Sequence, residues 1–184
     1  MYGNSRISLR IMPLEDKHAE ELVRRCAEDP ETTSWMFDSQ PAWAPLTTAQ
    51  LRDKIAEELK KPHTAVFALL SGEDFVGIGE WSASWDTWSP YAWFIIWPEH
   101  RRKGLGREAA RMLLEKTFLE NPGHSISTAT ADWNEPALRF LRSMGFRDIG
   151  RMRRTHMKGG EYRDTLFFDI LRSEYMTKGK GVRR

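Results

Sequence analysis

The chain has 184 residues and a formal net charge of +2, and its length fits one domain. Hydrophobic residues make up 40% of the chain and charged residues 29%, a balance that excludes wholesale disorder. The last eight residues hold four basic side chains and no acidic one, and without them the net charge falls from +2 to −2. The charge balance therefore gives no reason to expect a nucleic-acid-binding surface.

Cysteine and histidine usage narrows the class of protein further. Cys26 is the one cysteine of the chain, so no internal disulfide can form. The five histidines include no His-Glu-x-x-His pair, and we therefore expect no metal site. No apolar run approaches the ~20 residues that span a bilayer, and residues 1–6 lead into no hydrophobic signal segment. We therefore expect a cytoplasmic protein without a membrane partner.

The first third of the chain predicts one strand and two helices. Residues 7–11 alternate between apolar and polar side chains, and residues 16–28 carry one apolar stripe at helical spacing. Residues 29–46 form an aromatic loop with three prolines, and long ordered loops tend to be functional. The capping box Thr47-x-x-Gln50 opens the second helix.

The middle of the chain predicts three strands, a helix and a fourth strand. The three strands cover residues 65–70, 75–85 and 91–97, and a short turn joins the first two. A helix then runs over about residues 104–119, and residues 125–131 form a strand rich in β-branched side chains. The path from the third strand to the fourth is typical of a right-handed crossover between parallel strands.

The last third predicts a helix and a closing hairpin. Asn134 and the Glu-Pro that follows it open the helix, and Gly145 ends it. Residues 149–156 and 165–171 form a hairpin around two glycines.

The element order βααβββαβαββ indicates an α+β domain with a mixed, mostly antiparallel twisted sheet that is flanked by helices. We place this single domain at residues 1–176. Residues 177–184 form a basic tail with two glycines and almost no apolar surface to bury, and we expect this tail to be disordered.

A basic, glycine-rich loop between the third strand and the next helix carries the chemistry. The unpaired N–H groups and the dipole of a helix start attract anions, and glycines let an anion approach the backbone closely. Gly104 and Gly106 stand at this helix start. The four cations around them are Arg101, Arg102, Lys103 and Arg107. The loop therefore predicts a cradle for a ligand with more than one phosphate.

Two common phosphate-binding loops do not fit. A Walker A loop needs Lys-Ser/Thr after its second glycine, whereas Arg107 and Glu108 follow Gly106. A dinucleotide-binding fingerprint needs its first glycine at the strand end, but six residues separate the strand from Gly104.

The pattern Arg101-x-x-Gly104-x-Gly106 resembles the Arg/Gln-x-x-Gly-x-Gly/Ala motif of the Gcn5-related N-acetyltransferases, the GNAT superfamily. Asn134, with Gly-Phe beginning eleven residues later, is similar to a later segment of that family. Residues 162–175 resemble the branch that acetylates the N-termini of ribosomal proteins. The resemblance implies a single-domain GNAT-like fold and acetyl-CoA as co-substrate.

The resemblance also implies how acetyl-CoA is held. Backbone groups of Phe94 and Ile96 would hold the pantetheine arm as an added strand would, and N–H groups of the loop would bind the pyrophosphate. The residues assigned to the loop's part of the site are Arg101, Arg102, Lys103, Gly104, Leu105, Gly106 and Arg107. The Asn134 side chain would contact the arm, although an asparagine there is equally suited to be a plain helix N-cap.

Transfer to an amine requires that the ammonium ion, with a reference pKa of ~10.4 for lysine, first lose a proton. Glu80 and Asp132 are the candidate catalytic bases. By strand alternation Glu80 lies on the face of Val76 and Ile78, where a salt-bridged structural acid is the alternative interpretation. Asp132 follows a strand end, where capping of the helix entry is the alternative.

A general acid of the family type is missing. The position of the family's tyrosine is Leu141 here, and the position of the ribosomal branch's serine is Ala137. Tyr162 and His156 are the conceivable substitutes.

We therefore predict an acetyl-CoA-dependent N-acetyltransferase that acts by direct attack of a primary amine, on a small molecule or a protein N-terminus. Cys26 lies in the middle of a helix and is not placed to form a covalent intermediate. A homodimer is a further expectation. The alternative function is a non-catalytic acyl-CoA-binding module, which the two missing hydroxyl groups favour.

Overall fold

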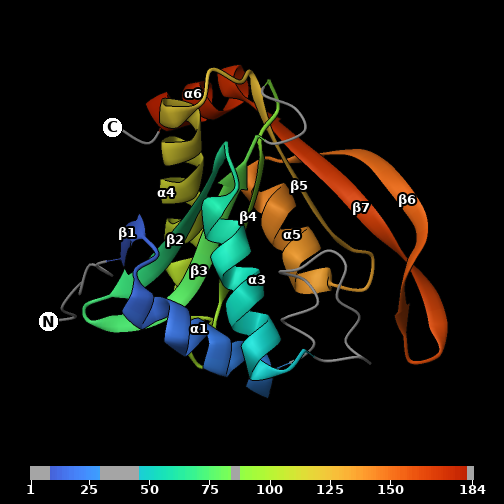
Figure 1. Ribbon diagram of the computed structural model, residues 1–184. Coiled ribbons are helices and arrows are strands. Elements are labelled where there is room, and N and C mark those ends of the chain that lie inside the picture. Colours follow the sequence, from blue (N-terminus) through green and yellow to red (C-terminus); the bar gives the residue numbers. More distant parts are fainter. Residues whose placement is uncertain (1–8, 30–45, 84–87, 182–184) are drawn as a thin grey trace, which may run out of the picture.

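The computed structural model describes residues 9–29, 46–83 and 88–181, and its strands form one seven-stranded sheet (Figure 1). The strand order across the sheet is β1-β2-β3-β4-β5-β7-β6. Neighbouring strands are antiparallel, except that β4 and β5 run parallel. The α+β class, the mostly antiparallel mixed sheet and the parallel crossover predicted from the sequence are therefore confirmed.

The elements of the first half follow the predicted order. They are β1 (Leu9–Pro13), α1 (Asp16–Glu28), α3 (Thr48–Lys60), β2 (Thr64–Ser71), β3 (Asp74–Ser82) and β4 (Tyr91–Ile96). The predicted capping box of α3 is present, because the Gln50 N–H group donates to Thr47 Oγ1 and the Gln50 side chain accepts from the Thr47 N–H group. Most of the predicted aromatic loop, residues 30–45, lies outside the described residues.

The second half adds a short 3₁₀ helix and one α-helix to the prediction. Its elements are the 3₁₀ helix η1 (Pro98–His100), α4 (Leu105–Glu120), β5 (Ser125–Ala131), α5 (Glu135–Met144), β6 (Arg147–Lys158), β7 (Glu161–Leu171) and α6 (Arg172–Gly181). Residues 177–181, which we expected in a disordered tail, are part of α6. None of the helices in the described ranges is long and apolar enough to cross a membrane.

Helix α6 is anchored by the guanidinium group of Arg172. This group donates to the carbonyl oxygens of Phe118 at 2.8 Å, Asn121 at 2.6 Å and Gly123 at 2.9 Å. The last carbonyls of a helix have no partner within the helix, so a cation placed there satisfies them and opposes the negative end of the dipole. Arg172 therefore fixes the start of α6 against the end of α4.

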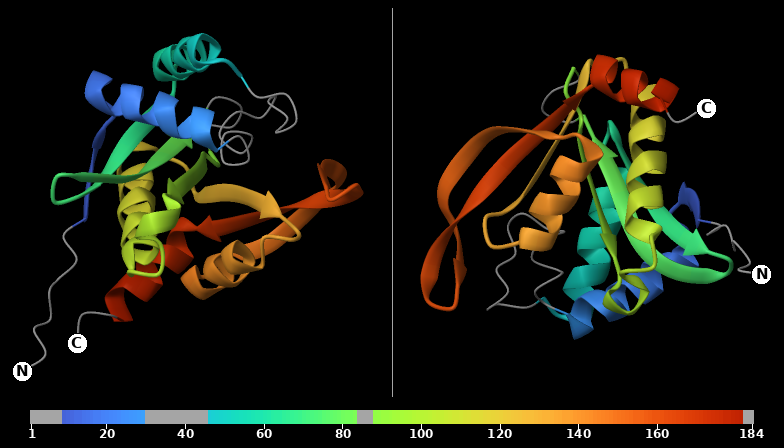
Figure 2. Two further views of the ribbon diagram at one scale, coloured as in Figure 1. Left: turned by 90° about the horizontal axis from the view of Figure 1, so that it is seen from below. Right: turned by 180° about the vertical axis from the view of Figure 1, so that it is seen from behind.

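The helices cover the two faces of the sheet, as the left view of Figure 2 shows. On one face, α1 and α3 pack on alternate residues of the strands, among them Ile78, Trp93 and Ile95. On the other, α4 and α5 pack on Ala92, Phe94 and the buried residues of β5 and β7. We call these the α1/α3 face and the α4/α5 face. Because strand side chains alternate, neighbours such as Trp93 and Phe94 serve opposite faces.

The sheet opens between β4 and β5. The ladder between these two parallel strands consists of the one pair Tyr91–Ser127, whereas β5 pairs with β7 along its whole length from Ser125 to Ala131. Beyond Tyr91, β4 is no longer paired with β5. On its other side, β4 stays paired with β3 as far as Ile96. The two strands thus form a wedge that widens toward their carboxyl ends, which we call the β4–β5 wedge.

Candidate active site

The wedge brings the two chemically distinctive loops of the sequence to one place. If the register of Tyr91 and Ser127 continued, Ile96 would lie opposite Asp132. The basic loop follows Ile96 directly, and Asn134 follows Asp132 by two residues. Carboxyl ends of parallel strands are a common place for ligand sites, because the loops and helix starts after them share one edge of the sheet.

The backbone of β4 directs Phe94 and Ile96 into the wedge. The carbonyl oxygen of Pro90 points toward β5, where it accepts from the Ser127 N–H group, and the Trp97 N–H group points the other way, to Val76. Because N–H and C=O groups alternate in direction along a strand, those of Phe94 and Ile96 point to the β5 side. This geometry supports the predicted role of both residues toward an extended ligand.

The loop after β4 bends back to the start of α4. Arg101 Nε donates to the Ile96 carbonyl oxygen at 2.8 Å, which ties the loop to the strand end. Arg102 and Gly104 both have positive φ, at 60° and 82°, and Gly104 is the N-cap of α4. Since glycine has no side chain to cap the helix, the amides of the first turn and the positive end of the dipole are open to an anion.

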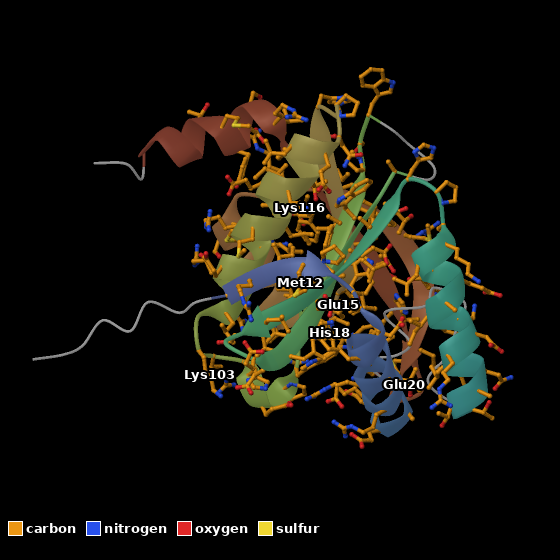
Figure 3. The ribbon with its side chains drawn as sticks, turned by 60° about the vertical axis from the view of Figure 1, so that its left-hand side comes forward. Met12, Glu15, His18, Glu20, Lys103 and Lys116 are labelled. Atoms are coloured by element: carbon orange, nitrogen blue, oxygen red, sulfur yellow. The ribbon has the colours of Figure 1, made fainter. Side chains whose placement is uncertain are left out.

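Positive charge surrounds this helix start. The side chains of Arg101, Arg102, Lys103 and Arg107 are all exposed, and Figure 3 shows Lys103 at the outer edge of the loop. Arg107 reaches across to α5, where its guanidinium group lies 3.3 Å from Ser143 Oγ and 3.5 Å from Met144 Sδ. The loop thus keeps the concentration of cations that the sequence predicted.

Gly106 has room around it. A Cβ atom added there would meet only the Phe94 ring, at 4.0 Å. The packing of the described residues therefore does not require glycine at this position. A ligand that approaches the backbone closely would require it, and the residues of the cradle fit the pyrophosphate of acetyl-CoA in this respect.

Asn134 is a helix cap in this structure. Its Oδ1 accepts from the Ala137 N–H group at 3.4 Å, and its Nδ2 donates to Thr130 Oγ1 at 3.2 Å. The capping interpretation is therefore confirmed. Contact of the same side chain with the cofactor arm stays a prediction.

Asp132 ties the end of β5 to β7. Its Oδ2 accepts from the Asp164 N–H group at 3.3 Å, and its own N–H group donates to the Asp164 carbonyl oxygen at 3.0 Å. Its Oδ1 is buried and has no hydrogen-bond partner among the residues that the structure describes. The carboxylate is thus half satisfied, and it does not cap α5, a role that Asn134 fills.

Glu80 lies on the α1/α3 face, opposite Trp93 in the β3–β4 ladder. It lines a small hollow, with an enclosed volume of about 20 Å³, between the sheet and helices α1 and α3. The other residues of the hollow are Leu14, Leu22, Ile55, Glu58, Leu59, Val66, Ile78 and Trp93. Glu80 and Asp132 therefore stand on opposite sides of the wedge, Glu80 on the strand beyond β4 and Asp132 at the end of β5.

The strand face predicted for Glu80 needs one correction. Ile78 shares its face, but Val76 packs on the opposite side with Leu105 and Ala109 of α4. The register shifts between Leu69 and Leu70 of β2, where Val76 of β3 is the extra residue of a bulge, and a break of register turns side chains to the other face.

The two substitutes for a general acid lie on different faces of the β6–β7 hairpin. His156 pairs with Arg163, and its Nε2 lies 2.9 Å from Thr165 Oγ1. Burial lowers the pKa of His156, while the nearby charge of Asp132 raises it. Tyr162 is the next residue of β7 before Arg163, so its ring faces the other way, and it is 60% exposed. Leu141, at the family's tyrosine position, packs against the core.

A family model for the acetyltransferase (GNAT) domain matches residues 8–147. The chain belongs to this family. It is an N-acetyltransferase that uses acetyl-CoA as its co-substrate. This confirms the class of enzyme and the co-substrate predicted from the loop motif.

Named relatives support the same class. The chain is 25% identical over 132 residues to the "SPbeta prophage-derived uncharacterized N-acetyltransferase YokL" of Bacillus subtilis, which covers 71% of this chain and 75% of that protein. It is 27% identical over 86 residues to the spermidine N(1)-acetyltransferase of Escherichia coli K12, and the aligned segment covers 47% of this chain and 46% of that protein. The chain thus matches about half the length of the latter.

The fold is shared with a spermidine N-acetyltransferase from Vibrio cholerae, solved in complex with CoA and spermine. The TM-score is 0.77 at 21% identity, over 91% of this chain and 98% of that one. By their names, the Escherichia coli and Vibrio cholerae proteins are spermidine N-acetyltransferases rather than enzymes of ribosomal proteins. They do not support the ribosomal branch that residues 162–175 resembled.

Proposed function

We propose that this enzyme acetylates a primary amine of a small molecule, with the two substrates approaching the wedge from opposite faces of the sheet. The observation that carries the proposal is the parting of β4 and β5 beyond the pair Tyr91–Ser127. The anion cradle borders this opening next to α4, and the hollow that contains Glu80 lies on the α1/α3 face.

Acetyl-CoA supplies an activated thioester when it is bound. The amides from residues 102–107 would bind its pyrophosphate, and the exposed cations beside them would neutralise the charge. The backbone groups of Phe94 and Ile96 would hold the pantetheine arm in the wedge by strand-like hydrogen bonds. The Ile96 N–H group would also donate to the thioester oxygen as negative charge develops there.

Glu80 is our preferred base. The amine must lose a proton before it attacks, and a carboxylate on the acceptor's side of the sheet is placed to accept it, directly or through water. Asp132 remains the second candidate. One of its carboxylate oxygens already accepts from the Asp164 backbone, and this bond makes a positioning role at the end of β5 the simpler assignment.

A small acceptor suits the hollow better than a folded protein does. The hollow next to Glu80 has an enclosed volume of about 20 Å³, room for one water molecule or one amino group, and its lining is mainly apolar with Glu58 and Glu80 as acidic groups. The spermidine acetyltransferases among the relatives, by their names, act on a small cationic amine. A protein N-terminus, the other acceptor that the sequence left open, therefore becomes the less favoured choice. The homodimer and the cytoplasmic location stay predictions.

Release of free CoA thiol in the presence of amines tests the proposal. The panel contains spermidine, an amino acid, an aminoglycoside and a peptide with a free N-terminus. We expect thiol release with at least one small amine, and its loss in Glu80→Gln and Gly106→Asp. Binding of acetyl-CoA without thiol release from any amine would instead support the non-catalytic acyl-CoA-binding module.

A further inference from the structure

The indole ring of Trp133 already holds an ammonium group in this structure. Lys158 Nζ lies over the ring, 5.6 Å from its centroid. The His156 ring meets the same indole edge to face, with centroids 5.5 Å apart and an interplanar angle of 85°. Trp133 stands one residue after Asp132, at the carboxyl end of β5 and so at the rim of the wedge.

Strand pairing places this cluster on the α1/α3 face. Ser127 shares its face with Tyr91, and two steps of alternation along β5 bring Ala131 to the same face. Ala131 pairs with Thr165 of β7, and Thr165 Oγ1 lies 2.9 Å from His156 Nε2. His156 and the indole ring it touches therefore flank the wedge on the face that also carries Trp93 and Glu80.

A bulge in β6 brings the tip of the hairpin to this position. The register shifts between Met152 and His156, where Arg154 adopts a positive φ of 56°. The Arg154 N–H group donates to Asp164 Oδ1 at 2.9 Å, and Asp164 is in turn bound to Asp132 through its backbone. Bulges re-aim side chains and often lie next to active sites. Here the bulge fixes the tip against the end of β5 although almost all of β6 is exposed (Figure 1).

The surroundings of the ring favour a cation. Asp132 lies next to Trp133 in the chain, and within the described residues its buried Oδ1 has no hydrogen-bond partner. The charge of Asp132 also reaches His156, whose pKa it raises against the effect of burial. An aromatic face beside a carboxylate attracts an ammonium ion through both the ring quadrupole and the negative charge.

We propose that Trp133, His156 and Asp132 form a subsite for an ammonium group of the acceptor, and that Lys158 occupies this subsite as an internal competitor. The proposal rests on the proposed function and adds to it the residues that recognise the acceptor. The Lys158 side chain is a primary amine like the acceptor, and it is exposed on a hairpin tip, so an incoming ammonium group can displace it.

The test is steady-state kinetics with spermidine as the varied acceptor. Lys158→Met removes the competitor, and we expect the acceptor KM to fall about two- to fivefold, with kcat and the KM for acetyl-CoA unchanged. Lys158→Arg keeps a cation over the ring and should behave as the wild type. Trp133→Leu should raise the acceptor KM about fivefold, and Trp133→Phe should raise it less.

Lys116→Met is the matched control. Lys116 Nζ lies over the ring of Phe67 at 5.1 Å, on the α4/α5 face, and Phe67 is in β2, two strands away from β4. We expect no change in the acceptor KM for this variant. An acceptor KM that is the same in Lys158→Met and Lys116→Met would overturn the proposal, and so would a Trp133→Leu variant that melts like the wild type and binds the acceptor equally well.

Failure of the subsite and failure of the proposed function give different results. If the wild type acetylates spermidine but Lys158→Met has no effect on its KM, the subsite is wrong and the function stands. If the wild type releases no thiol, calorimetric titration of spermidine into the wild type and into Lys158→Met still tests the subsite. Tighter binding by Lys158→Met supports the subsite, and equal or absent binding rejects it.

Discussion

Arg101 Nε donates to the carbonyl oxygen of Ile96 at 2.8 Å, so the first arginine of the basic loop holds the end of the strand that precedes it. This bond separates Arg101 from its neighbour Lys103, which is exposed at the outer edge of the loop. Arg101 and Lys103 therefore have different roles, although they stand in one cluster of charges in the sequence. Arg101 sets the shape of the cradle, and Lys103 adds charge to it.

We expect Arg101→Ala to lower both stability and cofactor affinity. Loss of a charge-assisted bond to a strand-end carbonyl should cost about 1–2 kcal/mol in the free energy of unfolding, and the loosened loop should bind acetyl-CoA more weakly. Lys103→Ala should weaken binding without a change in melting temperature. Calorimetry and thermal melts of both variants check this, and equal melting temperatures for the two would contradict it.

Gly106→Asp should weaken acetyl-CoA binding by about tenfold or more, because it places a side chain and a negative charge in the cradle. The fold should survive, since a Cβ there meets only the Phe94 ring at 4.0 Å and an acid in the first turn of a helix is favourable. Gly150→Asp is the charge-matched control, because a Cβ at Gly150 would meet no atom of the described residues within 4 Å and the residue lies on the exposed β6. Unchanged affinity in Gly106→Asp would exclude the cradle.

The protonation of His18 should lower the free energy of unfolding in mild acid. His18 is buried on α1 beside Phe75, with ring centroids 5.3 Å apart, and it completes the capping box with Glu15 (Figure 3). Burial lowers its pKa, so the folded state favours the neutral ring. The unfolded chain, with a histidine pKa of ~6.5, then takes up the proton more readily. The stabilisation is complete above that value and is lost as the pH falls through it toward the folded pKa.

His18→Gln isolates this effect, because glutamine is a usual capping-box residue at this position and does not titrate. We expect the free energy of unfolding of the wild type to fall relative to the variant between about pH 7.5 and pH 5.5. Urea unfolding at several pH values measures the difference. A difference that does not change with pH would show that His18 does not contribute.

Arg172→Ala should destabilise the protein by about 2–3 kcal/mol, because it leaves three backbone carbonyl groups, at the end of α4 and in the loop after it, without their donor. Truncation after Thr177 is the comparison. It removes the end of α6 but keeps Arg172 and Tyr175, whose hydroxyl group donates to the Arg111 carbonyl oxygen. The truncated chain should melt within a few degrees of the wild type. A larger loss than in Arg172→Ala would show that the end of α6 contributes more than its start.

The sequence predicted the elements whose signals are local. The capping box at Thr47, the N-cap at Asn134 and the glycine stop at Gly145 all stand where their patterns indicated, and β5 has the bounds 125–131 that its β-branched run predicted. Helix α6 was missed because it is only weakly amphipathic and ends among glycines. Its one local signal is Glu174, whose Oε2 accepts from the Leu171 N–H group at 3.2 Å.

The site could be predicted only in part. The cradle is contiguous in the chain, so its glycines and cations reveal it. The wedge depends on how two parallel strands register across a helix, and no local pattern encodes this. The bulge that turns Val76 away from the face of Ile78 is set by pairing with β2, so simple alternation was wrong there. Trp133 was not singled out, because its partners His156 and Lys158 reach it only through the bulge in β6.

The last prediction concerns proton transfer. For the wild type, kcat/KM should rise with pH as the base and the amine lose their protons, and then level off. Glu80→Gln keeps the shape of the side chain but cannot accept a proton, so we expect kcat to fall about a hundredfold or more. Asp132→Asn should have the smaller effect on kcat, because a carboxamide oxygen can still accept from the Asp164 N–H group. A loss in Glu80→Gln that is confined to the acceptor KM would assign Glu80 to binding alone.

Departure of the thiolate in the same reaction should not require a general acid. A thiol has a reference pKa of ~8.5, well below that of an alkyl amine, so the thiolate leaves readily and solvent protonates it afterwards. Leu141 stands at the family's tyrosine position and packs against the core, so Leu141→Tyr should change kcat little. To test whether a general acid is needed, kcat of the folded wild type is measured between about pH 8.5 and pH 10. A steep fall there would reveal an essential acid that loses its proton in this pH range. Burial lowers the pKa of His156 from its ordinary value of 6.5, so His156 cannot be that acid, and Tyr162→Phe would be the first variant to examine.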